Sequence, residues 1–202
     1  MFKKQGLDVT IKKIPQKDRH LAIASGDVQC AATTVETWIA WNASGVATTQ
    51  IFQLDKSYGA DGMVVKPAIA SIKDLKGKTM AAANAMIAGN TDIDGGMTYE
   101  PFLSAVRAKP EAGKIIATTL DYPMIMDTFG CTPKFLADNP KAAQGLANGY
   151  FEALEMIQKE PKKSFEIMGA DVKQSAEAFE GSQKFLRWQD KAANQKFFAG
   201  EH

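Results

Sequence analysis

The sequence predicts an α/β fold with a mostly parallel sheet, and two patterns carry this prediction. Short apolar segments rich in β-branched residues alternate with segments whose apolar residues recur every three or four positions. Turns rich in Gly and Asp separate them, as in SYGADG at 57–62. Alternating strands and helices favour sheets that are flanked by helices.

The first third of the chain contains four expected strands and two expected helices. The strands are expected at 8–14, 28–32, 50–54 and 63–65. The first helix is expected at 20–24 and ends at Ser25-Gly26, while Thr33-Thr34 begins the second. Val35, Ile39 and Ala43 follow helical spacing along this second helix.

The rest of the chain changes from alternating elements to consecutive helices. We expect a helical turn at 71–75, strands at 78–83, 91–97, 114–119 and 125–132, and helices at 84–88, 99–106 and 140–159. The last of these helices is amphipathic, with Leu146, Tyr150, Leu154 and Ile157 on one face.

The composition excludes several classes of protein. Charged residues make up 23% of the 202 residues, the net charge is +1, and no basic stripe marks a nucleic-acid interface. No apolar run approaches the roughly 20 residues needed to span a bilayer. The first residues, MFKKQG, lack the apolar region of a secretory signal.

Cysteine and histidine are too sparse for metal or acid–base chemistry. Cys30 and Cys131 are too few for a zinc site and favour buried free thiols, with a bridge possible only if the fold joins their strands. His20 and His202 lie near no nucleophile motif. We therefore expect no metal, no cofactor and no catalytic residue.

Seven segments, taken in order, resemble the NMT1/THI5-like substrate-binding proteins of ABC importers. They are SGDVQ (25–29), ATTVE (32–36), GADGMVVK (59–66), DLKGK (74–78), AGNTD (88–92), TYEPF (98–102) and FLADNP (135–140). No single motif is specific, but their order covers nearly the whole chain.

The sequence also departs from the pattern of that family. Relatives begin with a strand and a helix before FKKQGL, have about 30 more residues between Ala83 and Asn84, and continue beyond His202. Either a segment between 83 and 84 is omitted from the sequence as given, or the chain is a shortened version of the family.

The resemblance implies a two-lobed fold like that of type II periplasmic binding proteins, with parallel or mixed sheets flanked by helices. Lobe 1 would comprise 1–64 and 124–202, and an incomplete lobe 2 would comprise 65–123. The resemblance further implies a monomer that is periplasmic or lipid-anchored outside the cell. It would bind a small molecule, deliver it to an inner-membrane ABC permease and perform no catalysis.

Ligands of α/β folds bind where strands lead into helices, and three loops meet this condition. The candidate ligand-binding residues in or near these loops are Thr33, Thr34, Glu36, Tyr58, Asp61, Thr98, Tyr99, Glu100 and Asp127. Thr33 or Thr34 can equally be a helix cap, Asp61 can stabilise a turn, and Glu100 can serve a helix N-terminus. Trp38, Trp41 and Tyr122 offer further apolar walls.

Acidic side chains and aromatic walls favour a small organic solute with an amine or aromatic nitrogen over bare nitrate. The predicted ligand is a nitrogen- or sulfur-containing nutrient such as a sulfonate, taurine, an amine or a pyrimidine. Three alternatives stay open: an enzyme of pyrimidine-precursor synthesis with the same fold, a ligand-sensing module, and a shortened scaffold without a ligand.

Overall fold

The computed structural model describes residues 1–200, apart from the side chains of residues 82 and 84. His202, one of the two histidines of the chain, lies outside the described residues. The described chain forms two compact units. Unit 1 comprises Met1–Asp55, Met126–Ile167 and the residues from Trp188 onward, and unit 2 comprises Lys56–Ile125 and Met168–Arg187.

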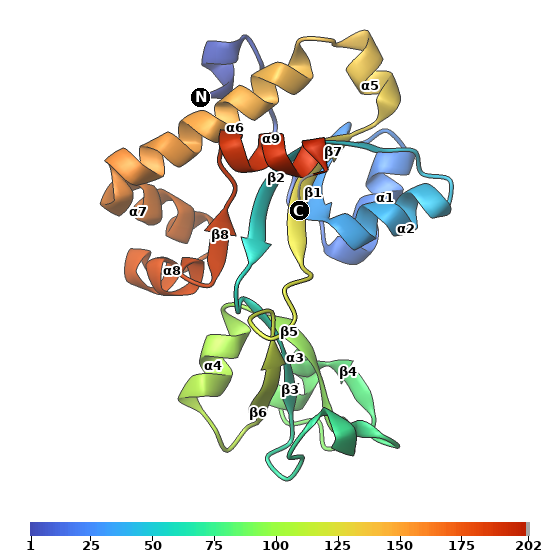
Figure 1. The fold of residues 1–202 in the computed structure, drawn as a ribbon, viewed down its shortest axis with the longest axis vertical. Helices are drawn as coiled ribbons and strands as arrows, with labels where there is room; N and C mark the ends of the chain where they lie inside the picture. The colour runs from blue at the N-terminus through green and yellow to red at the C-terminus, as the bar shows by residue number, and fades with distance from the viewer. Residues whose placement is uncertain (201–202) are drawn as a thin grey trace. The chain divides into compact units, whose positions relative to one another are not determined.

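Unit 1 is built on a four-stranded sheet with the strand order β1-β7-β2-β8 (Figure 1). Its elements are η1 (Phe2–Gln5), α1 (Gln16–Ala24), β1 (Cys30–Thr34), α2 (Val35–Ala43), β2 (Thr49–Ser57), β7 (Met126–Cys131), α5 (Pro133–Asp138), α6 (Ala142–Lys159), β8 (Leu186–Trp188) and α9 (Lys191–Ala199). Three elements cross the division between the units: β2 ends in unit 2, the helix α7 (Pro161–Asp171) begins in unit 1 and ends in unit 2, and β8 begins in unit 2 and ends in unit 1.

Both faces of the unit 1 sheet are covered at β7. Cys131 packs with Phe52 and Leu146 of α6 on one face. Its neighbour Gly130 points to the opposite face, where an added Cβ would lie 3.1 Å from the Trp38 ring of α2. The contacts on both faces are apolar, so the sheet is held between α2 and α6.

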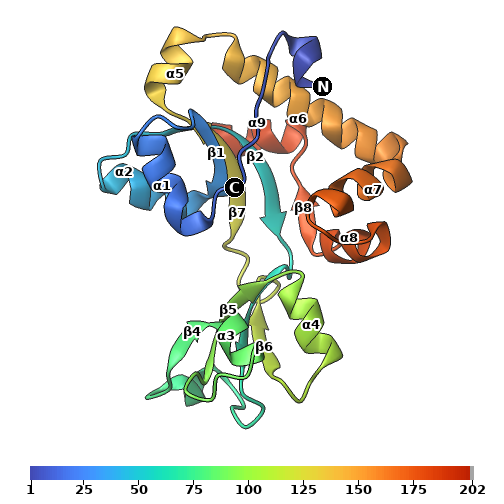
Figure 2. The same ribbon diagram turned by 180° about the vertical axis from the view of Figure 1, so that it is seen from behind.

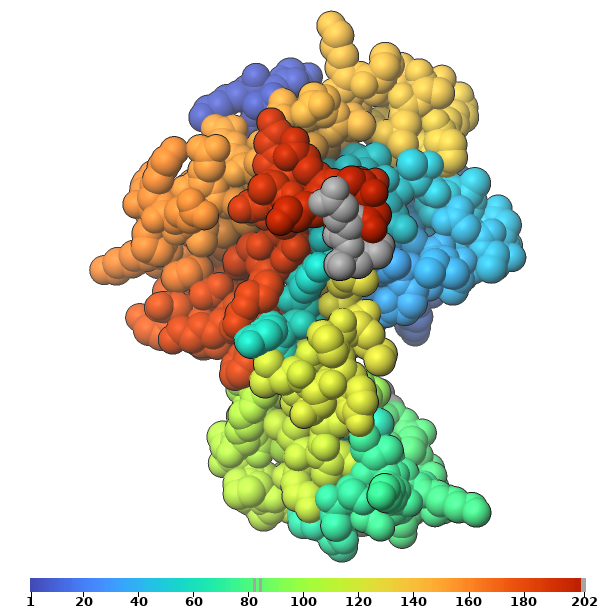
Figure 3. All heavy atoms as spheres, viewed as in Figure 1, coloured from blue at the N-terminus to red at the C-terminus, as the bar shows by residue number. Residues whose placement is uncertain are grey.

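The N-terminal turn η1 packs on α6 because that helix carries glycine where the two meet. A Cβ at Gly149 would lie 2.5 Å from the Phe2 ring, and a Cβ at Gly145 would lie 2.9 Å from Leu7. The space-filling view shows the blue N-terminal residues against the orange helix (Figure 3). The amphipathic face predicted for this helix is confirmed by buried Leu146 and Leu154.

Unit 2 contains a second four-stranded sheet, with the order β4-β5-β3-β6. Its elements are β3 (Asp61–Val65), η2 (Ile72–Leu75), β4 (Met80–Ala82), α3 (Ala83–Ile87), β5 (Gly95–Tyr99), α4 (Phe102–Ala108), β6 (Lys114–Thr118) and α8 (Ala176–Gln183). Figure 2 shows α3 and α4 beside these strands.

One face of the unit 2 sheet is packed and the other is open to solvent along β5. Val64, Met86, Leu103 and Val106 form the core between β3 and the two helices α3 and α4. Met97 and Tyr99, which share the opposite face of β5, are 52% and 55% exposed.

The sheets are mixed rather than mostly parallel, which corrects the first expectation. β1 pairs antiparallel with β7, and β3 pairs antiparallel with both β5 and β6, whereas β4 and β5 are parallel. The reason is that the chain returns to unit 1 through β7 and lays it beside β1 in the opposite direction. Mixed sheets flanked by helices were part of the predicted architecture, and that part is confirmed.

The strand expected at 8–14 is wrong. This segment has no regular secondary structure, and Ile11 is 77% exposed. Side chains rather than backbone groups hold it: Lys12 Nζ donates to Asp27 O at 3.0 Å, and Arg19 Nε donates to Ile14 O at 2.9 Å. An alternating pattern forms a strand only when a partner strand is available.

The helix expected at 99–106 begins later. Tyr99 ends β5, and α4 begins at Phe102 after the N-cap Pro101.

Two tryptophans expected as ligand walls lie in the core. On α2 the buried residues are Trp38 and Trp41, whereas Ile39 is 63% exposed. This helix has apolar residues on more than one side. Spacing alone therefore did not show that the tryptophans, rather than Ile39, face the core.

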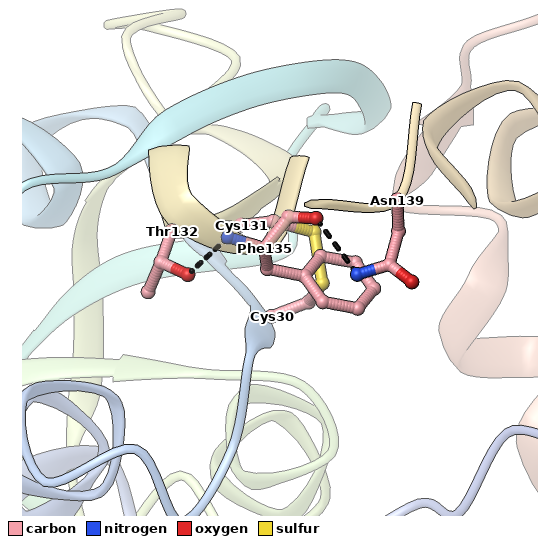
Figure 4. Close-up of a disulfide and its surroundings, with 5 residues drawn as sticks. All are labelled: Cys30, Cys131, Thr132, Phe135 and Asn139. Carbon is pink, nitrogen blue, oxygen red and sulfur yellow. Dashed lines mark hydrogen bonds between the residues drawn. A yellow bond between two sulfur atoms is a disulfide. The ribbon is translucent and has the colours of Figure 1, made fainter. Parts of the chain in front are cut away.

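The free thiols favoured by the sequence are also wrong, because Cys30 and Cys131 form a disulfide (Figure 4). These residues lie directly opposite each other in the β1–β7 register. Figure 4 also shows the start of α5 next to the bridge, where Phe135 N donates to Thr132 Oγ1 at 3.3 Å. The bridge closes a loop with a sequence separation of 101 residues, which contains β2 and residues 56–125 of unit 2.

The compact units divide at 55/56, 125/126, 167/168 and 187/188, whereas the sequence division fell at 64/65 and 123/124 and placed residues 168–187 in lobe 1. The strand β3 explains part of the difference, since it pairs with β5 and β6 of unit 2. At the junction 83/84 the chain runs from β4 directly into α3. That the two units act as lobes closing on a ligand stays a prediction.

Candidate functional site

The candidate residues fall into two groups, one in each unit. Unit 1 holds Thr33, Thr34, Glu36 and Asp127 near the junction of β1 and α2. In the β1–β7 register Thr34 lies opposite Asp127, and Thr33 lies opposite Thr128. The structure therefore brings together two segments that are distant in the sequence.

Thr33 and Thr34 do not present their side chains to the same side. Adjacent strand residues point to opposite faces, and Thr33 is only 4% exposed. Thr34 shares its face with Asp127, and its Oγ1 lies 2.8 Å from Thr37 Oγ1. Thr34 and Asp127 are thus the pair that a ligand could contact together.

The first turn of α2 combines a positive helix end with an exposed carboxylate. Thr34 has the extended backbone of an N-cap, but its side chain makes no capping hydrogen bond. The partial positive charge of the helix start therefore remains available to an anion. Glu36 in the same turn is exposed and offsets part of that charge.

Unit 2 holds Tyr58, Asp61, Thr98, Tyr99 and Glu100 around the start of β3 and the end of β5. Asp61 lies opposite Tyr99 in the antiparallel register, and Glu100 N donates to Ala60 O at 2.8 Å. Asp61 and Tyr99 share the open face of the sheet.

Thr98 faces the core side instead and is 6% exposed. Its register partner is Gly62, where an added Cβ would lie 3.3 Å from Leu103 of α4. Thr98 therefore belongs with the packed face and is separated from its neighbour Tyr99.

Glu100 is held by its own unit. Its side chain is 6% exposed, its Oε2 accepts from Ser104 N at 3.1 Å, and its Oε1 pairs with Arg107. The Arg107 guanidinium also lies 4.5 Å from the centre of the Phe185 ring. The carboxylate serves the first turn of α4 and is neutralised by Arg107, so the acidic balance predicted for the site is smaller than the sequence indicates.

Tyr58 is exposed, but one face of its ring is already covered. The Arg187 guanidinium lies 3.7 Å from the centre of that ring, and Tyr58 N donates to Phe185 O at 2.7 Å. Tyr99 contacts Phe102 edge to face, with the ring centres 5.7 Å apart. Tyr99 is therefore the more accessible aromatic surface of this group.

Three arginines next to the candidate residues were missed by the sequence reasoning. Arg19 Nη1 donates to Ala32 O at 3.2 Å, directly before Thr33, while Arg107 and Arg187 contact Glu100 and Tyr58. None follows a motif, and each lies on a different element from the residue that it contacts, so the pattern of residues held no signal for them.

A half-buried tyrosine joins α6 to β2 in unit 1. Tyr150 of α6 donates its hydroxyl hydrogen to Leu54 O of β2. Burial raises the pKa of the Tyr150 hydroxyl, and the nearby Asp55 carboxylate raises it further. The hydroxyl therefore stays protonated and fixes α6 to the strand that leads toward unit 2.

Among the described residues, no group of three or more His, Cys, Asp or Glu side chains could hold a metal ion. Within the same residues, no helix is long and apolar enough to cross a membrane.

The comparisons with known proteins agree on the family and the fold. The model of the NMT1/THI5-like family matches residues 1–100. This match agrees with the resemblance that the sequence motifs indicate. A search of curated protein sequences finds no match.

Solved structures resemble this NMT1/THI5-like chain at low sequence identity. The alkanesulfonate-binding protein SsuA from Xanthomonas axonopodis pv. citri, bound to MOPS, matches with a TM-score of 0.68 and 14% identity over 85% of this chain and 72% of that chain. The aliphatic sulphonate binding protein SsuA from Escherichia coli matches with a TM-score of 0.63 and 14% identity over 83% and 69%. A Candida albicans protein with the generic periplasmic binding protein fold matches at 0.72 and 13% over 94% and 75%.

These likenesses establish the fold of the NMT1/THI5-like chain as that of periplasmic binding proteins, which confirms the predicted fold class. They do not assign a ligand to it. The nine candidate residues stay predictions, and the geometry divides them. Thr34–Asp127 and Asp61–Tyr99 are juxtaposed pairs, whereas Thr33 and Thr98 are buried and the Glu100 side chain is paired with Arg107.

Proposed function

We propose that this NMT1/THI5-like chain is the solute-binding component of an ABC importer. It binds a small organic molecule, passes it to a permease of the inner membrane and performs no chemistry on it. It works as a monomer in the periplasm, or tethered by a lipid outside the cell. The family match and the periplasmic-binding-protein fold support this proposal.

The observation that carries the proposal is the presence of one matched residue pair in each unit. Each pair couples a carboxylate with a hydroxyl or ring on one face of a sheet: Thr34 with Asp127, and Asp61 with Tyr99. A few converging polar groups beside aromatic surface suit recognition of a small organic solute. We propose that one ligand engages both pairs.

We propose a zwitterionic ligand that carries an amine or aromatic nitrogen, such as taurine or another aminosulfonate. The carboxylates of Asp61 and Asp127 suit the cationic nitrogen, and the start of α2 suits the anionic group. The Xanthomonas relative is described as bound to MOPS, which is itself a sulfonate with a basic nitrogen.

The disulfide supports the proposed location. Bridges between cysteines persist in the periplasm and outside the cell, and they are rare in the cytoplasm. The Cys30–Cys131 bridge joins two strands of the unit 1 sheet and is therefore part of the fold.

Isothermal titration calorimetry tests the proposal with taurine, alkylsulfonates, a pyrimidine and nitrate. We expect saturable binding of taurine and at least a tenfold loss of affinity in Asp61→Asn and Tyr99→Ala, since each removes a directed contact worth about 1.5 kcal/mol or more. The matched controls are Asp138→Asn and Phe198→Ala, which change exposed residues of unit 1 and should leave the affinity unchanged.

Binding of nitrate alone would contradict the ligand class but keep solute binding. Absence of heat with every solute, in a protein whose circular dichroism shows it folded, would contradict solute binding itself.

A further inference from the structure

Two buried hydroxyl groups lie beside the backbone of Asp61 in unit 2. Ser57 ends β2 and is 5% exposed, and Thr119 follows β6 and is 4% exposed. Their hydroxyl oxygens are 2.7 Å apart, although 62 positions separate the two residues in the sequence. Neither residue was among the candidate ligand-binding residues. A buried pair of this kind has to satisfy its hydrogen bonds within the protein.

The two hydroxyls accept hydrogen bonds from the turn that leads into β3. Gly59 N donates to Thr119 Oγ1 at 2.8 Å, and Asp61 N donates to Ser57 Oγ at 3.1 Å. Gly59 has a φ of +93°, and an added Cβ would lie 3.3 Å from the Leu120 side chain, so the turn requires glycine here. Side chains of the same unit therefore hold this turn in one conformation.

Both hydroxyl hydrogens are used in one arrangement of the pair. If Ser57 donates to Thr119, the Thr119 hydrogen is left for Asp61 O, a long contact at 3.5 Å. The reverse direction leaves the Ser57 hydrogen without an acceptor among the described residues. In the first arrangement, removing either oxygen leaves a buried backbone donor unpaired, which is costly.

Both backbone groups of Asp61 point toward this hydroxyl pair. Glu100 N donates to Ala60 O at 2.8 Å, so the next residue of β3 directs its backbone away from β5. Asp61 N accordingly reaches Ser57 Oγ, and Asp61 O accepts from Thr119 N at 3.0 Å. Because both groups are held, the direction of the Asp61 side chain is fixed, and it points to the same face as its register partner on β5.

We propose that Thr119 and Ser57 are positioning residues that aim the Asp61 carboxylate at the ligand. The inference rests on the proposed function for the ligand, and on the hydrogen bonds above for the positioning. Both hydroxyls are buried and act through the backbone of Asp61 rather than by touching the ligand. A binding group contributes fully only when its direction is fixed, so loss of a supporting hydroxyl lowers the affinity without removing a ligand contact.

NMR tests the positioning without a ligand. In the unmodified protein the Gly59 and Asp61 amides should exchange slowly with solvent. Thr119→Val should speed the exchange of the Gly59 amide and shift the carboxylate carbon resonance of Asp61. The matched control is Thr118→Val, since the Thr118 hydroxyl bonds within the turn 118–121. Rapid exchange of both amides in the unmodified protein, or an Asp61 resonance that Thr119→Val moves no more than the control does, would overturn the proposal.

A double-mutant cycle, measured by taurine titration, tests whether Thr119 acts through Asp61. Thr119→Val should weaken binding about tenfold, and Thr119→Ser, which keeps the hydroxyl, should restore it. In the Asp61→Asn background the same Thr119→Val change should cause no further loss. An independent structural role would instead multiply the two losses, and that result would contradict the proposal.

The outcomes separate this proposal from the function on which it rests. If the unmodified protein binds no solute, the proposed function fails, and the NMR comparison still decides the positioning. If Thr119→Val does not fold, Ser57→Ala replaces it in the cycle, because it removes the acceptor of the Asp61 amide and keeps Gly59 N bonded to Thr119. Unchanged taurine affinity in a folded Thr119→Val or Ser57→Ala protein would refute the positioning role alone.

Discussion

The two sheets differ in how their faces are covered, and the two residue pairs of the candidate site differ accordingly. The unit 1 sheet lies between α2 and α6, and the Cys30–Cys131 bridge fixes β1 to β7. The unit 2 sheet packs α3 and α4 on one face and leaves Met97 and Tyr99 exposed on the other. Thr34 and Asp127 are thus placed by a closed framework, whereas Asp61 and Tyr99 lie on an open surface.

The largest expected effect concerns the bridge in unit 1. Removing it in Cys30→Ser/Cys131→Ser should cost about 4 kcal/mol, because the unfolded chain regains the freedom of a loop of about 100 residues. Urea unfolding followed by tryptophan fluorescence is a clean measurement, since Trp38, Trp41 and Trp188 all belong to unit 1. If a reductant leaves the urea midpoint of the unmodified protein unchanged, the bridge adds no stability to unit 1.

A substitution in the core of unit 2 should destabilise that unit, and hydrogen exchange rather than tryptophan fluorescence should detect the change. Leu103→Ala removes a side chain that is 0% exposed and should cost about 2–5 kcal/mol. Hydrogen exchange should show faster opening of β3 and β5, while the tryptophan fluorescence of unit 1 stays native. Phe102→Ala, at a residue that is 38% exposed, serves as the neighbouring control with an effect below about 1 kcal/mol. Equal losses in both units would show that they unfold as one.

A smaller, pH-dependent effect belongs to Tyr150 in unit 1. The folded-state pKa of this hydroxyl lies above its unfolded value of about 10, so its contribution is complete below pH 10 and falls as the pH rises further. Tyr150→Phe should cost about 1 kcal/mol at neutral pH, because Leu54 O loses one of its two donors and keeps only Gln189 N. It should also flatten the loss of stability above pH 10, measured as urea midpoints between pH 8 and 11. If the urea midpoint of Tyr150→Phe falls with pH above 10 as steeply as that of the unmodified protein, Tyr150 is not the group responsible for the loss.

The smallest effect tests the open face of unit 2. Met97→Lys should change the stability by no more than about 0.5 kcal/mol, since the side chain is already 52% exposed. The matched change on the covered sheet is Phe52→Lys, which buries a charge at a residue that is 4% exposed and should prevent stable folding. If thermal melts show that Met97→Lys is strongly destabilising, this face is covered in solution.

Elements whose signal is local were predictable from the sequence. The helix 140–159 follows from its apolar spacing, and the turn at 71–75 from Ser71 and Asp74, which form a capping box. The resemblance carried the fold class, because seven weak motifs in one order are specific where each alone is not.

Features that depend on partners distant in the sequence were not predictable. The segment 8–14 has the pattern of a strand but no partner, and the bridge required the β1–β7 register to become visible. Even over a short separation the pairing is not evident: Glu100 looked available to a ligand, but α4 turns Arg107 back to it across seven residues. A residue type suggests a role, but its neighbours decide whether the group is available.

The central claim is that one small solute engages residues of both units, and NMR titration tests it most directly. With taurine, the account predicts that the amides of Thr34 and Asp127 and those of Asp61 and Tyr99 shift along one saturable curve with a single Kd. Shifts confined to one unit, or none with any solute of the series, would contradict it.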